Sequence, residues 1–305
     1  MFVHKKKSSF NTALVLLLIV SIVACNSEKP KQEEVANGDT SSVKMDTATI
    51  SPAAKKIFRS LPSPMQVLSM FQKDGAAFRG DILNSTGNVS SYSTNFSKAL
   101  NLGIYAADLA YSGINNQTQT AADYMKAAKT LAEGLGVTNV FEASNVLTRF
   151  QKNMNDKDTL LHIIVDMNRE IINYFKENER GNMASLVMAG GWIEGGYIAV
   201  KLVEKNKNEK IVNRIAEQKL LLNNLILLLS EYKSEKEVSD FIDRLNELQH
   251  IYDGVTISYT SKAATTNKTG NKTVVGNESK VSISDEQLKN ITNKIESIRN
   301  TIVKK

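Results

Sequence analysis

The sequence contains little cysteine and proline and few aromatic residues. Each of these shortages excludes certain kinds of site or favours certain kinds of fold. Cys25 is the single cysteine in 305 residues. A lone cysteine excludes an internal disulfide and any metal site built from cysteine alone. The chain has four prolines and 7% aromatic residues, whereas 42% of its residues are hydrophobic. Few helix breakers and a largely aliphatic apolar content are typical of a helical protein.

The chain also lacks a concentrated charge of one sign. Its formal net charge is +6, and this falls to +3 without the first 24 residues, which carry Lys5, Lys6 and Lys7. Nucleic-acid binding needs a basic patch or stripe on one face. We therefore expect no nucleic-acid partner.

No hydrophobic run in the N-terminal segment is long enough to cross a bilayer. A basic stretch that ends at Thr12 precedes the 12-residue apolar run "ALVLLLIVSIVA", whereas a spanning helix takes about 20 residues. This pattern predicts a signal peptide over residues 1–24. The run ends in "IVAC", which resembles the bacterial lipobox, and the resemblance implies lipid attachment at Cys25.

Residues 25–51 are mostly small and polar, and they cannot bury enough apolar surface to offset the entropy lost on ordering. We expect this segment to be a tether between a lipid on Cys25 and the rest of the chain. The "KQEE" at 31–34 resembles the signal that sends lipoproteins of Bacteroidetes to the cell surface. The expected location is the bacterial cell envelope, at the periplasmic face of the outer membrane or on the cell surface.

Helical periodicity and short joints dominate the region 52–254, which predicts an all-α domain. Short loops between helices indicate antiparallel neighbours, so we expect a helical bundle or an array of helical hairpins. One helix start is predicted at Ser63–Pro64. A second start, a capping box, is predicted from Ser234 and Glu237. The further helices are predicted over 94–111, 115–136, 140–154, 156–177, 182–205 and 208–231.

The tail differs from the rest. Residues 255–283 begin with the alternating "VTISYT" and continue with a Thr/Asn/Lys/Gly-rich stretch, which predicts a short β-hairpin or a polar linker. Residues 284–305 predict an amphipathic helix that opens with a capping box of Ser284 and Gln287. Its narrow apolar face either packs on the domain or contacts a partner chain, and the apolar residues are Leu288, Ile291, Ile295, Ile298 and Ile302.

The stretch "MAGGWIEGGYIA" at 188–199 holds four glycines and the only tryptophan. It lacks the Lys-Ser/Thr of a phosphate-binding loop and follows no strand, so nucleotide binding is not expected. Glu194 and Lys201 argue against a membrane span. Each glycine costs about 0.8–1 kcal/mol in a helix relative to alanine. We interpret the stripe that contains Gly191 and Gly195 as a point of close helix–helix approach.

Two acids stand in apolar surroundings. Asp108 lies in "NLGIYAADLAY" with Tyr105 one turn before it, and Glu194 lies beside Trp192. A buried charge needs a partner. Tyr105, Asp108, Trp192 and Glu194 therefore form either a structural hydrogen-bond network or a ligand pocket, provided that their helices meet.

Other signals for chemistry are weak. His162, Asp166 and Glu170 share one helix face at four-residue spacing, but zinc sites normally have more nitrogen or sulfur ligands. We expect neither a metal site nor a cofactor. The sequence also contains no nucleophile elbow and no His-Glu-x-x-His motif.

Three stretches together resemble an uncharacterised family of Bacteroidetes envelope lipoproteins. They are "NLGIYAADLAY" (101–111), "MAGGWIEGGYIA" (188–199) and "SDEQLKNITNKIESIRNTIV" (284–303). The resemblance implies an envelope location and a single fold that includes the C-terminal helix. It brings no catalytic residues.

From these observations we expect a lipid-anchored envelope protein, bound to the membrane through Cys25, that acts without catalysis as a binding or scaffold protein. The alternative is a small-molecule binding protein or enzyme with a pocket near Asp108 and Glu194. The partner, the ligand and the oligomeric state are not specified by the sequence.

Overall fold

A computed structural model describes residues 51–52, 68–69, 72–73, 76–143, 145–205, 207–261, 265–267, 272–274 and 277–304. The predicted signal peptide, Cys25 and the tether up to residue 50 lie outside the described residues, as does the helix start predicted at Pro64.

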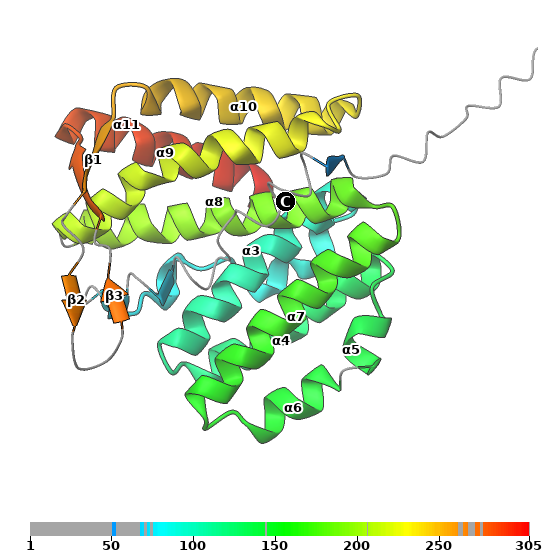
Figure 1. Cartoon of the computed structure of the whole chain (residues 1–305). Coiled ribbons are helices and arrows are strands. Elements are labelled where there is room, and N and C mark those ends of the chain that lie inside the picture. Colours follow the sequence, from blue (N-terminus) through cyan, green and yellow to red (C-terminus); the bar gives the residue numbers. More distant parts are fainter. Residues whose placement is uncertain are drawn as a thin grey trace, which may run out of the picture. The chain divides into compact units, whose positions relative to one another are not determined.

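The described chain is an all-α bundle with a short antiparallel β-hairpin before the last helix, which confirms the predicted fold class (Figure 1). Two 3-10 helices come first, η1 (Gly80–Ile82) and η2 (Thr86–Ser91). The α-helices are α3 (Asn95–Ile114), α4 (Thr118–Gly134), α5 (Asn139–Ala143), α6 (Val146–Lys152), α7 (Lys157–Glu177), α8 (Gly181–Lys205), α9 (Glu209–Ser230), α10 (Lys236–Tyr252) and α11 (Asp285–Val303).

Helices α3 and α8 form the centre of the bundle. They share the most extensive contact between any two described elements, and every residue of α3 from Ala99 to Ile114 is buried. Helices α4 and α7 pack on α3, whereas α9 and α11 pack on α8 and α10 covers α9 and α11 (Figure 1). A helix that is apolar on all sides must be surrounded. This explains why α3, with a run of Leu, Ile and Ala, is central.

Two glycines bring the backbones of α3 and α8 into contact. A Cβ on Gly190 would lie 1.9 Å from the carbonyl oxygen of Leu100, and one on Gly103 would lie 2.0 Å from the carbonyl oxygen of Val187. The close approach predicted for this stretch is therefore present, although Gly190 rather than Gly195 lies at the crossing. A Cβ on Gly195 would meet no atom within 4 Å.

Helix α8 is long and apolar enough to cross a membrane by length and composition, and it is the one such helix among the described residues. Inside the bundle, 78% of the most apolar 18-residue stretch of α8 is buried by the rest of the protein. Its apolar character is therefore explained by its central position.

Two local predictions were wrong. The helix predicted over 140–154 is divided into α5 and α6, because Asn145 adopts a left-handed conformation with φ of 46°. The capping box predicted at Ser234 and Glu237 does not form. Helix α10 begins one residue later, with Glu235 as its N-cap and no side-chain capping bond.

The tail contains two strand pairs and the last helix. Strand β1 (Thr256–Ser261) pairs with β4 (Asn277–Ser282), and β2 (Thr265–Asn267) pairs with β3 (Lys272–Val274), both antiparallel. Helix α11 begins with the predicted capping box of Ser284 and Gln287. It packs against α8, α10 and α3 of the same chain, so its apolar face is covered within the monomer.

Candidate functional site

Three helices bring two acids and one arginine together in the core. Asp108 comes from α3, Glu194 from α8 and Arg299 from α11, and their exposed fractions are 0%, 0% and 7%. The Arg299 guanidinium contacts the Glu194 carboxylate at two points. Arg299 Nε lies 3.0 Å from Glu194 Oε2, and Nη2 lies 3.1 Å from Oε1. We call Asp108, Glu194 and Arg299 the acid–arginine cluster.

The crossing of α3 and α8 places the two acids beside each other. Glu194 lies one turn after Gly190, and Asp108 lies just over one turn after Gly103. Because these glycines allow backbone contact, the next turns also remain close. The Asp108 and Glu194 carboxyls are close enough to interact, and this interaction contributes to the raised pKa of Asp108. One Asp108 oxygen, Oδ2, accepts a hydrogen bond of 3.2 Å from the backbone N–H of Asn84.

Arg299 also contacts groups outside the cluster. Its guanidinium stacks over the ring of Tyr197, with 4.5 Å between Cζ and the ring centroid. Its Nη2 lies 3.5 Å from the carbonyl oxygen of Ile82. The planar guanidinium suits this combination of a two-point ion pair with stacking on an aromatic ring.

Polar side chains around Asn84 cover the cluster on the side that faces η1 and η2. Asn84 is 2% exposed, and its Nδ2 donates to the hydroxyl of Tyr92 at 3.0 Å. The Tyr124 hydroxyl donates to the Asn84 carbonyl at 2.9 Å, and the Tyr105 hydroxyl donates to the Ser85 carbonyl at 2.8 Å. Tyr105 therefore anchors the loop beside the cluster, and its hydroxyl bonds to that loop rather than to Asp108.

Burial dominates the acid–base properties of the cluster. Loss of hydration raises the pKa of Asp108 well above its usual range, and the nearby negative charge of Glu194 raises this pKa further. Burial also raises the pKa of Glu194, but the positive charge of Arg299 opposes this effect. The two acids therefore differ, and Asp108 holds its proton more tightly than an exposed aspartic acid does.

Trp192 lies outside the cluster. Its ring is half-buried, and its Nε1 donates to Gln218 Oε1 of α9 at 3.1 Å. Of the four predicted residues, the structure thus brings Asp108 and Glu194 close enough to interact. Tyr105 lies at the edge of their network, and Trp192 of α8 faces α9.

Two surface pockets lie away from the cluster. The first, of about 190 Å³, is lined by Gly113, Asn116, Gln117, Thr118, Met154, Asn155, Lys157 and Leu160. The second, of about 330 Å³, is lined by Ser69, Asp158, Leu161, His162 and Val165. Neither is lined by Asp108, Glu194 or Arg299.

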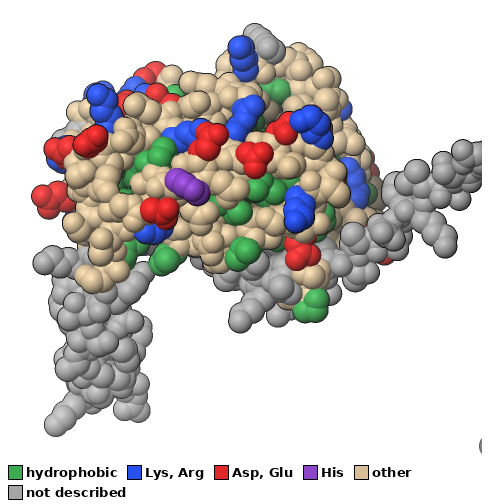
Figure 2. Space-filling model, turned by 90° about the horizontal axis from the view of Figure 1, so that it is seen from above, with side chains coloured by type: hydrophobic (Ala, Val, Ile, Leu, Met, Phe, Trp, Pro, Cys, Tyr) green, Lys and Arg blue, Asp and Glu red, His purple; other side chains and the backbone are tan. Residues whose placement is uncertain are grey.

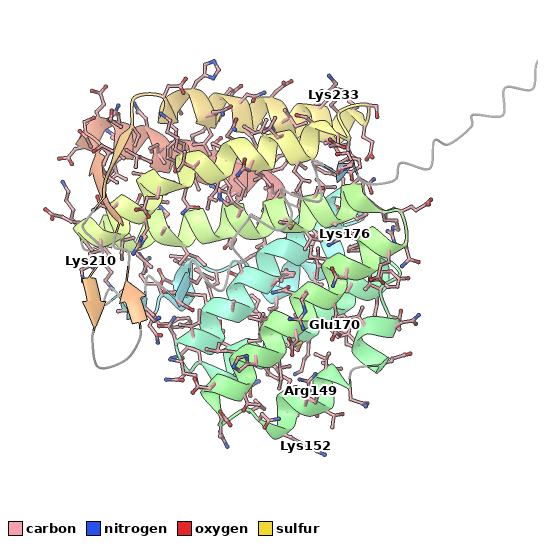
Figure 3. All side chains as sticks on the ribbon, in the orientation of Figure 1. Arg149, Lys152, Glu170, Lys176, Lys210 and Lys233 are labelled. Atoms are coloured by element: carbon pink, nitrogen blue, oxygen red, sulfur yellow. The ribbon has the colours of Figure 1, made fainter. Side chains whose placement is uncertain are left out.

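The row of His162, Asp166 and Glu170 lies on the outer side of α7. Asp166 pairs with Arg169 at 2.7 Å and with Arg149 of α6 at 3.7 Å (Figure 3, where Arg149 and Glu170 mark the two helices). Arginines thus neutralise the central carboxylate of the row. Across the described residues, no three His, Cys, Asp or Glu side chains are arranged to hold a metal ion.

Two important residues, Arg299 and Asn84, were not anticipated from the sequence. Arg299 lies four residues after Ile295 and three before Ile302, so helical spacing alone places it on the apolar face of α11. This position indicates from the sequence that Arg299 is partly buried. Asn84 belongs to the polar stretch between η1 and η2, and no sequence pattern marks it as buried.

Comparisons with known proteins add no relatives: no family model, no curated protein sequence and no solved structure matches this chain.

Proposed function

We propose that this protein is a lipid-anchored component of the bacterial cell envelope whose helical body acts as a non-enzymatic binding or scaffold protein. The proposal includes membership of the family of Bacteroidetes lipoproteins that its three sequence blocks resemble. One observation carries the non-enzymatic part: Glu194 is fully buried and held at two points by Arg299.

A catalytic or ligand-binding acid has to meet its substrate. Asp108 and Glu194 are both 0% exposed, and their neighbours are protein groups from α3, α8, α11 and the η1–η2 segment. A buried ion pair of this kind is a structural element whose loss disrupts the fold. This supports a structural role over the alternative of a pocket near these two acids.

Anchoring is proposed from the lipobox at Cys25. A single acyl chain holds a protein only weakly, whereas the multiply acylated cysteine of a bacterial lipoprotein holds it stably. A flexible segment of about 25 residues would reach roughly 25–30 Å. The body would then lie close to the membrane but free to contact a partner.

The surface supports a protein partner or small ligand over nucleic acid. On the face in Figure 2, lysine and arginine side chains are interspersed with acidic ones, and hydrophobic groups lie between them. Mixed charges of this kind produce no field of a single sign. Nucleic-acid binding would need such a field.

The anchor is tested by expressing the full chain and a Cys25→Ser variant in a Gram-negative host fed a palmitate analogue. The wild type should incorporate the label and fractionate with membranes, whereas Cys25→Ser should do neither. Protease treatment of intact cells then separates surface from periplasmic exposure. A Cys25→Ser variant that is still acylated and membrane-bound would contradict the proposal.

The structural role of the acids is tested with Glu194→Gln in the same chain. Removing the charge that pairs with Arg299 should lower the Tm by at least about 5 °C, since a loss of 1 kcal/mol shifts Tm by about 2–4 °C at this size. A Glu194→Gln variant with the wild-type Tm would instead favour the ligand pocket. A screen of small molecules for Tm shifts in the wild type that are lost in this variant would then identify its ligand.

A further inference from the structure

The acid–arginine cluster holds more acids than cations. The Arg299 guanidinium pairs with the Glu194 carboxylate, the Asp108 carboxyl lies beside Glu194, and all three side chains are more than nine-tenths buried. Arginine remains charged in proteins at any ordinary pH. If both acids were ionised, the core would carry one uncompensated negative charge, which burial makes very costly.

Neighbouring groups in the described part of the chain do not supply the missing positive charge. The amine of Lys201 in α8 pairs with Glu204 and Glu296 instead. The other titratable or charged groups around the cluster are Tyr92 near η2, Tyr105 of α3, Asp123 and Tyr124 of α4, Tyr197 of α8 and Glu296 of α11. Burial raises the pKa of Tyr105, Tyr124 and Tyr197, so their hydroxyls remain neutral.

The hydrogen bonds of Asp108 show where a proton belongs. Asp108 Oδ2 accepts from the Asn84 N–H, whereas Oδ1 receives a hydrogen bond from no donor among the described residues. Two carboxyl groups in contact repel each other unless one of them is a donor. A proton on Asp108 Oδ1, directed at Glu194, satisfies both oxygens and leaves Glu194 ionised for Arg299.

We propose that Asp108 keeps its proton at neutral pH and donates it to Glu194, so that one structural proton completes a neutral clamp that fixes α11 to α3 and α8. This inference is independent of the lipid anchor. It makes the proton a component of the tertiary structure, because the proton allows two acids to share the single guanidinium of Arg299.

The electrostatics of the two acids agree with this assignment. Burial and the neighbouring Glu194 charge both raise the pKa of Asp108, whereas the positive charge of Arg299 opposes the effect of burial on the pKa of Glu194. The clamp has further connections to α11, since Asn101 Nδ2 of α3 donates to the Ile302 carbonyl at 3.1 Å. Ile295 and Ile298 of α11 are also buried against the core.

The proposal fixes the sign of a pH effect. The folded state holds the Asp108 proton at pH values where the unfolded chain has lost it, so unfolding releases a proton. Stability from this group is fully present below the ordinary aspartate pKa. It falls as the pH rises toward the raised pKa of the folded state. In that window the unfolding equilibrium constant rises about tenfold per pH unit.

The test compares the full chain with Asp108→Asn, whose amide N–H₂ and C=O reproduce the donor and acceptor of a protonated aspartic acid. Denaturant unfolding is measured at pH 5, 6 and 7. Between pH 5 and 7 the unfolding constant of the wild type should rise about 100-fold more than that of Asp108→Asn. Equal pH slopes in the two proteins would overturn the proposal.

Infrared spectroscopy decides the question even if a variant fails to fold. The wild type at pH 7 should show the C=O band of one neutral carboxylic acid, and the band should shift when the protein carries ¹³C-labelled aspartate. It should vanish on unfolding. A folded wild type without this band, or a band that shifts only with labelled glutamate, contradicts the assignment to Asp108.

Glu194→Gln tests whether the Asp108 proton depends on the charge of Glu194. With Glu194 neutral, Asp108 becomes the one acid beside Arg299 and should ionise, so the neutral-acid band should disappear although Asp108 is intact. Persistence of the band in folded Glu194→Gln would show that the proton does not depend on the shared charge and would overturn the clamp.

Discussion

Arg299 and Glu194, 105 residues apart in the sequence, meet through two hydrogen bonds of 3.0 and 3.1 Å in the core of the bundle. Glu194 is on a central helix and Arg299 is on the last helix of the chain. Their contact ties the C-terminal helix to the middle of the fold, and it gives one explanation for the acid in the otherwise apolar stretch 188–199.

Arg299→Met should destabilise the protein by about 3–5 kcal/mol in urea unfolding, because it leaves a buried carboxylate without its partner. Arg299→Lys should destabilise the protein less, since lysine keeps the positive charge but cannot form two parallel hydrogen bonds to the carboxylate. The control is Lys294→Met, which breaks the surface pair with Glu247 and should change little. Equal losses for Arg299→Met and Lys294→Met would show that the buried pair has no special role.

Gly190→Ala should unfold at a much lower temperature than the wild type, because its Cβ would lie 1.9 Å from the backbone oxygen of Leu100. Gly195→Ala in the same helix meets no atom within 4 Å. It should stabilise the protein by about 0.8–1 kcal/mol through helix propensity. Calorimetry of the two variants distinguishes the glycine that permits helix contact from the one that does not, and the opposite order would refute the crossing.

Glu179→Gly should stabilise the protein by about 1 kcal/mol, because Glu179 follows the end of α7 with φ of 57°, where glycine has no steric cost. The backbone after α7 forms a C-terminal capping bond. The N–H of Arg180 bonds to the Phe175 carbonyl at 2.7 Å, and the Arg180 guanidinium lies 4.9 Å from the Phe175 ring. Glu179→Ala is the control, and its Tm in thermal unfolding should not rise in this way.

Asp156 should make the stability of α7 decrease in acid. It caps this helix by accepting hydrogen bonds from the N–H and hydroxyl of Thr159, and these bonds lower its pKa. A lowered folded pKa stabilises the protein above the unfolded value, and this contribution is lost as the pH falls through the folded pKa. Asp156→Asn keeps an acceptor without the titration. Its stability should therefore fall less between about pH 5 and 3, and identical acid profiles would contradict the effect.

Local signals in the sequence determined most of the fold. Apolar spacing located α7, α8, α9 and α11 to within one or two residues, since helical periodicity depends only on near neighbours. Glycine-rich composition predicted the close helix approach, and the capping box at Ser284 predicted the start of α11. The same local signals failed where one residue decided the outcome, as at Asn145, whose left-handed backbone divides α5 from α6.

The sequence by itself determined that Asp108 and Glu194 stand in apolar helices and need partners. Only the tertiary structure decided that these partners are each other and Arg299. The reason is physical: a helix pattern specifies which side of a helix is buried, but not which helix covers it or in what register. The Gly190–Gly103 crossing and the docking of α11 set that register, and they turn two isolated acids into one closed cluster.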